Sequence, residues 1–362
     1  MKILHLTNGV GWSGGLAQIQ RLISELNKHD ISSLLVAPPG SEVFAKLSDQ
    51  ECVKIPLRMA QDYDLIAAWK IRSLVRREKP DLVHAHHPIA HAVSLVALSG
   101  LAKPPFVVSR RVSFPLRKNP FSWWKYLSRR VSGYAVVSRS VKETLAQGGI
   151  DPQKVRVIYS GVYLDEFTRR AEWSQLKAEL KIPEDCAVVG KVANYSFWKG
   201  QQLFLRAAKR VLAQNPDVIF VLAGKDTLNL APQAQELGIG KNVRLLGFRD
   251  DIPRVISNFD FSVNCAIEGE GLSGAMRESL ALEVPVIASQ IAGNQELVQE
   301  GRTGYLVPVN SAQALADKIL YALSHRDEGK RLARAGREWV MANASVEKMA
   351  QDHLALYRGL IS

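Results

Sequence analysis

Residues 263–309 constrain the fold of this chain more than any other stretch. They read VNCAIEGEGLSGAMRESLALEVPVIASQIAGNQELVQEGRTGYLVPV. An apolar run that ends near Cys265 predicts a strand, and a glycine-broken loop follows it. Residues 273–282 then carry Ala275, Met276, Ser279 and Leu282 at helical spacing, before a second apolar run and a second helix. Strands that alternate with helices in this way predict a parallel α/β sheet.

Glu270 and Glu278 give this stretch its chemical content. The predicted helix places Glu270 on the loop before its N-terminus and Glu278 about a turn and a half inside it. Backbone N–H groups near Gly271 and Ser273 suit a phosphate or diphosphate at the positive helix end. A carboxylate beside such a site has sugar hydroxyls as its natural partners. The alternative is a helix-capping residue and a solvated helix residue.

Three segments, EGLSGAMRESLALEVPVIAS, GNQELV and GRTGYLVP, resemble the C-terminal signature of retaining glycosyltransferases of family 4, which have the GT-B fold. The resemblance places Glu270 and Glu278 at the two positions of an E-x7-E pattern that faces the donor. It implies that Glu270 contacts the donor sugar hydroxyls and Glu278 the ribose. Many members carry Gly where this chain has Ser273.

A loop after residues 187–192 supplies a candidate cation. Its sequence is ANYSFWKG, and Lys199 stands just before a predicted helix over residues 201–213, where it suits a diphosphate. The family pairs this Lys with an Arg five residues earlier, where this chain has Asn194. Lys191 is a candidate to compensate. The resemblance also assigns the nucleotide base to the loop that holds Phe248 and Arg249.

The N-terminal half begins with a strand over residues 2–6 and a glycine-rich loop, NGVGWSGG. Glycines between a first strand and a first helix let the backbone approach a phosphate closely. The resemblance implies that Gly14 and Gly15 lie near the donor diphosphate. The complete predicted donor set is Gly14, Gly15, Asn194, Lys199, Phe248, Arg249, Glu270, Gly271, Leu272, Ser273 and Glu278.

Three histidines, His84, His86 and His87, end the strand predicted over residues 81–85. Side chains just beyond the carboxyl end of a strand in an α/β sheet face the ligand crevice. The resemblance implies that His86 contacts the donor sugar near the reacting centre, so His86, Glu270 and Lys199 are the predicted catalytic residues. A metal site and a structural role stay open for the cluster. Asp62 and Asp64 form a lone DxD triplet, which we interpret as helix capping, and we predict no metal or other cofactor.

The formal net charge of +12 is unevenly distributed, because residues 82–142 contain no acidic side chain. Within this stretch, RRVSFPLRKNPFSWWKYLSRR interleaves cations with aromatic residues, which favours docking on an anionic membrane. The alternative is a core helix with a solvated basic face. Nucleic acid is a weaker candidate, since no known binding motif accompanies the patch. The predicted membrane or acceptor residues are Arg110, Arg111, Arg117, Lys118, Trp123 and Trp124.

Length and composition complete the expectation. The 362 residues allow two domains, predicted over residues 1–165 and 166–343, with a terminal helix over 344–362 that returns to the first. No apolar run reaches membrane-spanning length, no signal peptide is evident, and three separated cysteines form no disulfide or metal framework. We therefore expect a cytoplasmic protein, peripheral on the inner face of the membrane.

The sequence thus predicts an α/β protein of the GT-B type, with two doubly wound Rossmann-like domains facing across a cleft. The predicted function is metal-independent, retaining transfer of a hexose-like sugar from a nucleotide-diphosphate sugar to a glycan or glycolipid acceptor. The acceptor is expected to be lipid-linked, in bacterial lipopolysaccharide or exopolysaccharide synthesis. The alternatives are a sugar-nucleotide epimerase of the same fold and a non-catalytic membrane-surface binding module.

Overall fold

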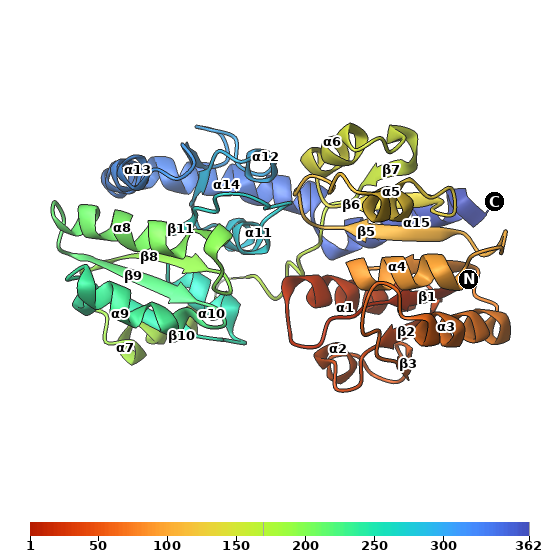
Figure 1. Ribbon diagram of the computed structural model, residues 1–362. Helices are drawn as coiled ribbons and strands as arrows, with labels where there is room; N and C mark the ends of the chain where they lie inside the picture. The colour runs from red at the N-terminus through yellow and green to blue at the C-terminus, as the bar shows by residue number, and fades with distance from the viewer. Residues whose placement is uncertain (169, 362) are drawn as a thin grey trace. The chain divides into compact units, whose positions relative to one another are not determined.

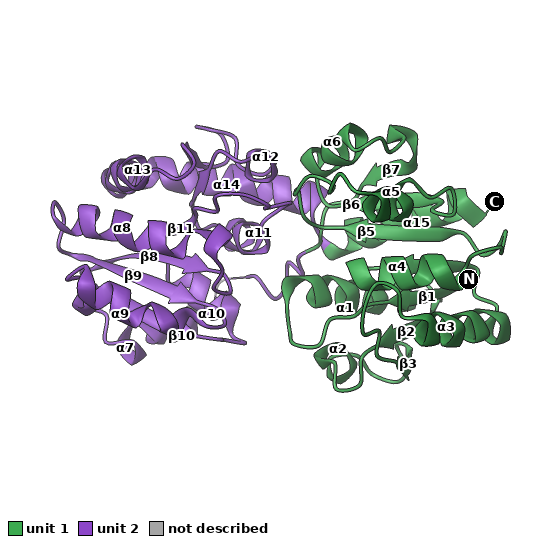
Figure 2. Ribbon diagram, in the orientation of Figure 1, with its two compact units in different colours: residues 1–161, 346–362 green, residues 162–345 purple. Residues whose placement is uncertain are grey.

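The computed structural model describes residues 1–168 and 170–361. It consists of two compact units, Met1–Gly161 with Val346–Ser362, and Val162–Ser345 (Figures 1 and 2). The sequence predicts the first domain boundary at residue 165 and the start of the returning helix at residue 344. The structure divides the chain a few residues away from both points.

Unit 1 is built on a seven-stranded parallel sheet (Figure 1). The strands run in the order β3-β2-β1-β4-β5-β6-β7. They are β1 Lys2–Leu6, β2 Ser32–Ala37, β3 Val53–Pro56, β4 Leu82–Ala85, β5 Phe106–Arg110, β6 Gly133–Val136 and β7 Val155–Val157. The helices are α1 Gly14–Asn27, α2 Glu42–Ala45, α3 Leu65–Glu78, α4 Pro88–Ala97, α5 Pro120–Leu127, α6 Arg139–Gln147 and α15 Val346–Ile361.

Unit 2 repeats this architecture on a six-stranded parallel sheet with the order β10-β9-β8-β11-β12-β13. The strands are β8 Ala187–Val192, β9 Val218–Ala223, β10 Val243–Gly247, β11 Phe261–Asn264, β12 Val286–Ser289 and β13 Tyr305–Val307. The helices are α7 Leu176–Glu179, α8 Gln201–Leu212, α9 Ala231–Glu236, α10 Ile252–Ser257, α11 Gly274–Ala281, α12 Ala292–Gln295, α13 Ala312–Ser324 and α14 Arg326–Asn343. A short 3-10 helix, η3, covers Phe197–Lys199.

The core of unit 2 follows from its strand sequences. Parallel strands that are covered on both faces read as continuous apolar runs, and β9 is VIFVLA with every residue buried. Helix α8 packs against α13, and α11 packs against α10 and α14. The doubly wound α/β fold predicted for both halves is therefore confirmed.

Each sheet has one point where the strand order reverses. It lies between β1 and β4 in unit 1, and between β8 and β11 in unit 2. Loops that leave neighbouring strands on opposite sides of such a point open a crevice at the carboxyl ends, where α/β proteins bind ligands. The residues that follow these four strands are therefore the first place to look for a site.

Candidate active site

At the reversal point of unit 2, Lys199 and Glu270 meet although 71 residues separate them in the sequence. Lys199 ends η3 after β8, and Glu270 lies in the loop after β11. The Lys199 Nζ donates to Glu270 Oε2 over 2.6 Å, and Nζ also lies 4.1 Å from the centroid of the Trp198 ring. The Glu270 side chain is 8% exposed. The aromatic face and the carboxylate therefore both hold the ammonium in place.

Gly200 makes this meeting possible. Its φ is +73°, and a Cβ at this position would lie 2.0 Å from the carbonyl oxygen of Cys265. Only glycine combines the left-handed conformation with so close an approach. Ile267 N–H donates to the Trp198 carbonyl over 2.8 Å, which fixes the β11 loop to η3.

The loop around Glu270 leads into α11. Ser273 is the N-cap, and its side chain accepts from the N–H of Met276 over 3.4 Å. Gly271 and Leu272 are buried, and a Cβ on Gly293 of α12 would lie 2.2 Å from the Glu270 carbonyl oxygen. The loop therefore packs tightly against α12. Glu278 follows within α11 and is half-buried.

Asn194 is uncharged, and its side-chain amide forms a structural hydrogen bond. Its Oδ1 accepts from the backbone N–H of Lys225 over 3.0 Å, which ties the β8 loop to the β9 loop. Lys191 lies within β8 and is 2% exposed. Among the described residues its ammonium has neither a hydrogen-bond nor an ion-pair partner. Strand alternation puts it on the same face as Val189, in the core that includes α8.

Phe248 and Arg249 follow β10, at the edge of the sheet and two strands from the reversal point. Phe248 is 56% exposed. Arg249 forms two hydrogen bonds to the Asp251 carboxylate, one of them 2.7 Å from Nε to Oδ1. This ion pair raises the pKa of Arg249 and lowers the pKa of Asp251. The charge of Arg249 is thus balanced within its own loop, whereas the Phe248 ring faces solvent.

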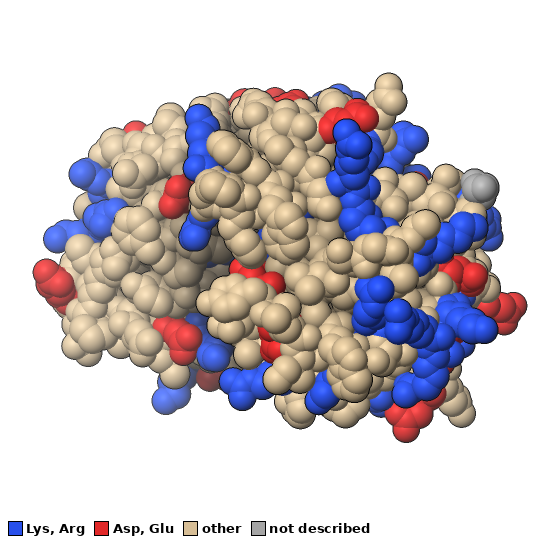
Figure 3. Space-filling view, turned by 45° about the vertical axis from the view of Figure 1, so that its right-hand side comes forward, with Lys and Arg blue, Asp and Glu red and all other residues tan. Residues whose placement is uncertain are grey.

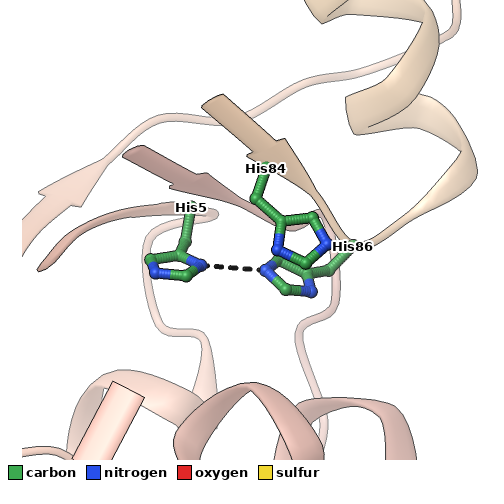
Figure 4. A group of neighbouring side chains, drawn as sticks. All are labelled: His5, His84 and His86. Atoms are coloured by element: carbon green, nitrogen blue, oxygen red, sulfur yellow. Dashed lines mark hydrogen bonds between the residues drawn. The ribbon is translucent and has the colours of Figure 1, made fainter. Parts of the chain in front are cut away.

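At the reversal point of unit 1, His5 of β1 lies beside His84 and His86 of the β4 end (Figure 4). His5 Nδ1 is 3.0 Å from His86 Nε2, and the rings of His84 and His86 have centroids 3.8 Å apart. Burial lowers the pKa of His84 and of His86 well below the usual value, and lowers that of His5 to about 3. All three imidazoles are therefore neutral at pH 7.

The donor set does not fit a metal ion, although one nitrogen from each ring lies within 4.8 Å of the others. Arg111 Nη2 lies 3.4 Å from His86 Nδ1, and a guanidinium can only donate. The neutral His86 ring must then carry its proton on Nε2, the nitrogen that faces His5. His84 is already held by the Tyr357 hydroxyl at 2.7 Å and by Ser109 Oγ at 2.8 Å.

The remaining predicted residues of unit 1 fall in two places. Gly14 and Gly15 open α1, and a Cβ on Gly14 would meet nothing within 4 Å. The start of α1 is therefore open to a ligand. The capping interpretation of the DxD triplet is confirmed for Asp64, which accepts from the N–H of Ala67 at the start of α3. Asp62 instead pairs with Lys125 over 3.0 Å.

The predicted membrane segment includes α5. Two arginines of the segment, Arg110 and Arg111, do not lie on its exposed surface. Arg110 is 8% exposed and donates to Tyr126 Oη over 2.8 Å and to the Phe114 carbonyl. Arg111 donates to the carbonyl of His86 over 3.3 Å. Since each guanidinium is engaged inside unit 1, neither belongs to the exposed patch.

The exposed part of the segment is larger than the sequence analysis predicted. Arg117, Lys118, Trp123 and Trp124 are exposed, as are Phe121 and Leu127. The Lys125–Asp62 ion pair connects α5 to the start of α3, where four more apolar side chains are each at least 66% exposed: Tyr63, Leu65, Ile66 and Trp69. They are out of phase with the buried Ala67, Ala68 and Ile71, and this was the missed signal.

We name these exposed residues of α3 and α5, with Arg117 and Lys118, the α3–α5 surface. Figure 3 shows Lys and Arg side chains concentrated on the right-hand part of the face that it draws. Among the described residues no helix has both the length and the apolar character needed to cross a membrane.

Comparisons with known proteins identify the family to which each half of the chain is similar. Residues 12–166 match the model of "Glycosyltransferase Family 4", and residues 174–339 match that of "Glycosyl transferases group 1". The chain is 25% identical to the lipopolysaccharide core biosynthesis glycosyltransferase LpsE of Rhizobium meliloti over 98% of both chains. It is 26% identical to a UDP-Gal:alpha-D-GlcNAc-diphosphoundecaprenol alpha-1,3-galactosyltransferase of Escherichia coli, over 71% of this chain and 70% of that protein.

The fold has close counterparts among solved structures. Anabaena Alr3699/HepE in complex with UDP and glucose superposes with a TM-score of 0.87, at 21% identity, over 99% of this chain and 100% of that chain. The two family models cover residues 12–166 and 174–339, which include the predicted catalytic residues His86, Lys199 and Glu270. The chain therefore belongs to the glycosyltransferases, with a family 4 domain followed by a group 1 domain, and has the GT-B fold.

Proposed function

We propose that this protein transfers a sugar, with retention of anomeric configuration, from a nucleotide-diphosphate sugar to a lipid-linked glycan acceptor. The pathway we propose is bacterial lipopolysaccharide or exopolysaccharide synthesis. The observation that carries the proposal is the Lys199–Glu270 pair beside the start of α11, at the reversal point of unit 2. It offers a cation for a diphosphate and a carboxylate for sugar hydroxyls within one site.

In this proposal, unit 2 holds the donor. The diphosphate lies between the Lys199 ammonium and the backbone N–H groups at Gly271–Ser273, which stabilise the negative charge that develops on the leaving group. Glu270, the resting partner of Lys199, accepts hydrogen bonds from the donor sugar. Glu278 of α11 accepts from the ribose hydroxyls. Phe248, with its exposed ring, lies against the base.

In unit 1, Gly14 and Gly15 are assigned to phosphate binding and His86 to orientation of the sugar. Arg111 holds the His86 ring by donating to both its carbonyl and its Nδ1. His86 therefore acts as a neutral hydrogen-bonding group that orients the sugar and carries no charge. Orientation of the reacting carbon in this way lowers the entropic part of the barrier.

The transfer requires no metal ion in this mechanism, because the Lys199 ammonium and the helix amides neutralise the diphosphate. Turnover in excess EDTA should equal turnover without it. Loss of turnover that magnesium restores would overturn this part of the proposal.

The acceptor is proposed to be lipid-linked because the α3–α5 surface suits an anionic membrane. Exposed aromatic side chains enter the headgroup region, and each nearby Lys or Arg contributes about 1 kcal/mol of attraction to anionic lipid. In flotation, wild type should rise with phosphatidylglycerol vesicles, and a Trp123→Ser, Trp124→Ser variant should stay at the bottom. If wild type also stays at the bottom in the presence of these vesicles, the membrane assignment is wrong.

Turnover provides the direct test. The protein is incubated with UDP-, GDP- and ADP-sugars and an undecaprenyl-diphosphate-linked sugar, and the anomeric configuration of the product is read by NMR. We expect the product to keep the anomeric configuration of the donor. The Lys199→Ala variant should form no product. A sugar epimerised without acceptor would instead support the epimerase alternative, and no turnover with any donor would favour a binding module.

A further inference from the structure

The carboxyl end of the unit 1 sheet holds a buried polar cluster of which the proposed reaction uses only His86. The other members come from four elements: His5, His84, Ser109, His353 and Tyr357. His5, His84 and Tyr357 are 0% exposed. Tyr357 lies on α15, at the far end of the sequence, and still approaches His84 to 2.7 Å. A cluster so deeply buried requires each polar atom to have a defined hydrogen-bonding role.

The position of Arg111 fixes these roles. Arg111 Nη2 lies 3.4 Å from His86 Nδ1 and can only donate, so Nδ1 of the neutral ring accepts. His86 Nε2 then carries the proton and donates to His5 Nδ1 over 3.0 Å (Figure 4). His5 in turn carries its proton on Nε2, a buried atom without a partner in the described residues.

Ser109 extends the same assignment to His84. Its hydroxyl lies 3.4 Å from His86 Nδ1, an acceptor, and we assign the hydroxyl proton to this contact. Ser109 Oγ is then free to accept from His84 Nε2 over 2.8 Å. His84 Nδ1 is left as an acceptor, and the Tyr357 hydroxyl donates to it. Every donor in this series points in one direction, from Tyr357 through His84, Ser109 and His86 to His5.

We infer that Tyr357, His84 and Ser109 form a hydrogen-bond relay that, with Arg111, holds His86 in the tautomer protonated on Nε2. These are positioning residues: they act on the sugar only through His86, and the inference rests on the proposed function of that residue. His86 thereby presents an N–H donor, for which His5 is the resting acceptor. A sugar hydroxyl that takes the place of His5 does so as an acceptor.

The relay gives α15 a role in the site beyond packing. Val346, Met349 and Leu354 of α15 are buried apolar residues, which explains why the helix docks on unit 1. They do not explain the phenol hydroxyl of Tyr357, because phenylalanine would fill the same volume without a polar atom to satisfy. The hydroxyl is explained if His84 needs a donor at Nδ1.

The first test reads tautomers by NMR. Protein labelled with ¹⁵N-histidine gives long-range ¹⁵N–¹H spectra in which the two nitrogens of each neutral ring differ, and His86→Asn and His84→Asn variants assign the signals. Wild-type His84 and His86 should each be a single tautomer protonated on Nε2. A His86 ring protonated on Nδ1 would overturn the inference. This measurement needs no turnover, so it is independent of whether the transferase proposal holds.

The second test removes the first donor. Tyr357→Phe deletes only the hydroxyl, and His84 should then populate both tautomers. The kcat for transfer should fall about three- to tenfold, the equivalent of one hydrogen bond, while KM for the donor stays unchanged. Tyr134→Phe is the matched control, since the Tyr134 hydroxyl is also buried in unit 1 but donates to the Tyr126 carbonyl over 2.6 Å.

The control should lose stability without a change in the His84 and His86 signals or in kcat. If Tyr357→Phe and Tyr134→Phe give the same His84 and His86 signals and the same kcat, the hydroxyl of Tyr357 is only a packing feature and the relay is wrong. Thermal unfolding of both variants checks that each is folded.

Discussion

At the scale of single residues, the Lys199–Glu270 ion pair is the feature on which the chemistry depends. Both groups are mostly buried, and they lie 2.6 Å apart, so each neutralises the other when no donor is bound. A diphosphate competes with Glu270 for the ammonium, and sugar hydroxyls compete with Lys199 for the carboxylate. A bound donor therefore breaks the ion pair, because its diphosphate takes Lys199 and its sugar takes Glu270.

Glu270→Gln should separate sugar contacts from diphosphate contacts. The amide no longer holds Lys199 by charge, so the nucleoside diphosphate should bind at least as tightly as to wild type. Transfer should fall about 100-fold, because the sugar is no longer held in its reactive orientation. Calorimetry with the nucleotide alone and initial rates with the sugar nucleotide measure the two effects. Loss of nucleotide binding would show that Glu270 contributes to the diphosphate site instead.

Lys191→Met tests whether this buried lysine replaces the arginine that family members carry at the position of Asn194. The ammonium has no partner in the described part of the chain, and methionine keeps most of the volume. The Kd of the nucleotide should rise about tenfold or more, the effect of losing one charged hydrogen bond. Lys241→Met, at an exposed lysine of the same unit, should leave the Kd unchanged. Equal affinities for both variants would refute the role.

The histidine cluster predicts a pH dependence of stability. Burial lowers the pKa of His5 to about 3 and of His353 to about 4, from about 6.5 in the unfolded chain. Below pH 6.5 the unfolded state thus binds more protons than the folded state. Stability should be constant above that pH and fall by up to about 1.4 kcal/mol per pH unit for each such histidine below it.

Urea unfolding between pH 7.5 and 5 measures this slope. His353→Asn should reduce it, and His29→Gln, at an exposed histidine of the same unit, should not. A stability that is flat down to pH 5 would mean that the cluster takes up protons while folded.

At the scale of elements, glycine determines where α8 can begin. Gly200 and Gly238 both have a φ of +73°, but a Cβ would meet the Cys265 carbonyl at 2.0 Å only at Gly200. Gly238→Ala should therefore cost about 1–2 kcal/mol for the backbone conformation alone. Gly200→Ala should cost more, and it should also weaken nucleotide binding by moving Lys199. Chemical denaturation and calorimetry compare the two, and equal losses of stability would contradict the close approach.

The elements were largely predictable from the sequence because apolar runs and glycine loops alternate along it. The strands over residues 2–6 and 187–192 appear in the structure with those bounds. The prediction that Arg110 lies on the exposed surface was wrong, because a cation that follows an apolar run can still point inward. Alternation puts it in phase with Phe106 and Val108, and the structure buries all three.

Other features depend on contacts between distant segments and could not be predicted. His84 Nδ1 and the Tyr357 hydroxyl form a hydrogen bond although the two residues are 273 positions apart, and nothing local to either residue indicates it. The exposed apolar side chains at the start of α3 are different, because their positions out of phase with the buried Ala67, Ala68 and Ile71 can be read from the sequence.

At the scale of the whole molecule, the chain applies one architectural rule twice. Each unit has a parallel sheet with a single reversal of strand order. In unit 2 the predicted catalytic residues Lys199 and Glu270 follow the two strands that flank it, and in unit 1 His86 follows one of them. Helix α15 returns to unit 1 from beyond unit 2 in the sequence. The central claim is that unit 2 holds the donor at its reversal point.

Calorimetric titration with UDP, GDP and ADP tests this claim most directly, on wild type, Lys199→Ala and Glu278→Ala. The account predicts that wild type binds one of the three nucleotides and that both substitutions weaken that binding, since Lys199 holds the diphosphate and Glu278 the ribose. Binding that neither substitution changes would contradict the assigned site. Absence of binding of all three at millimolar concentration would contradict the donor function itself.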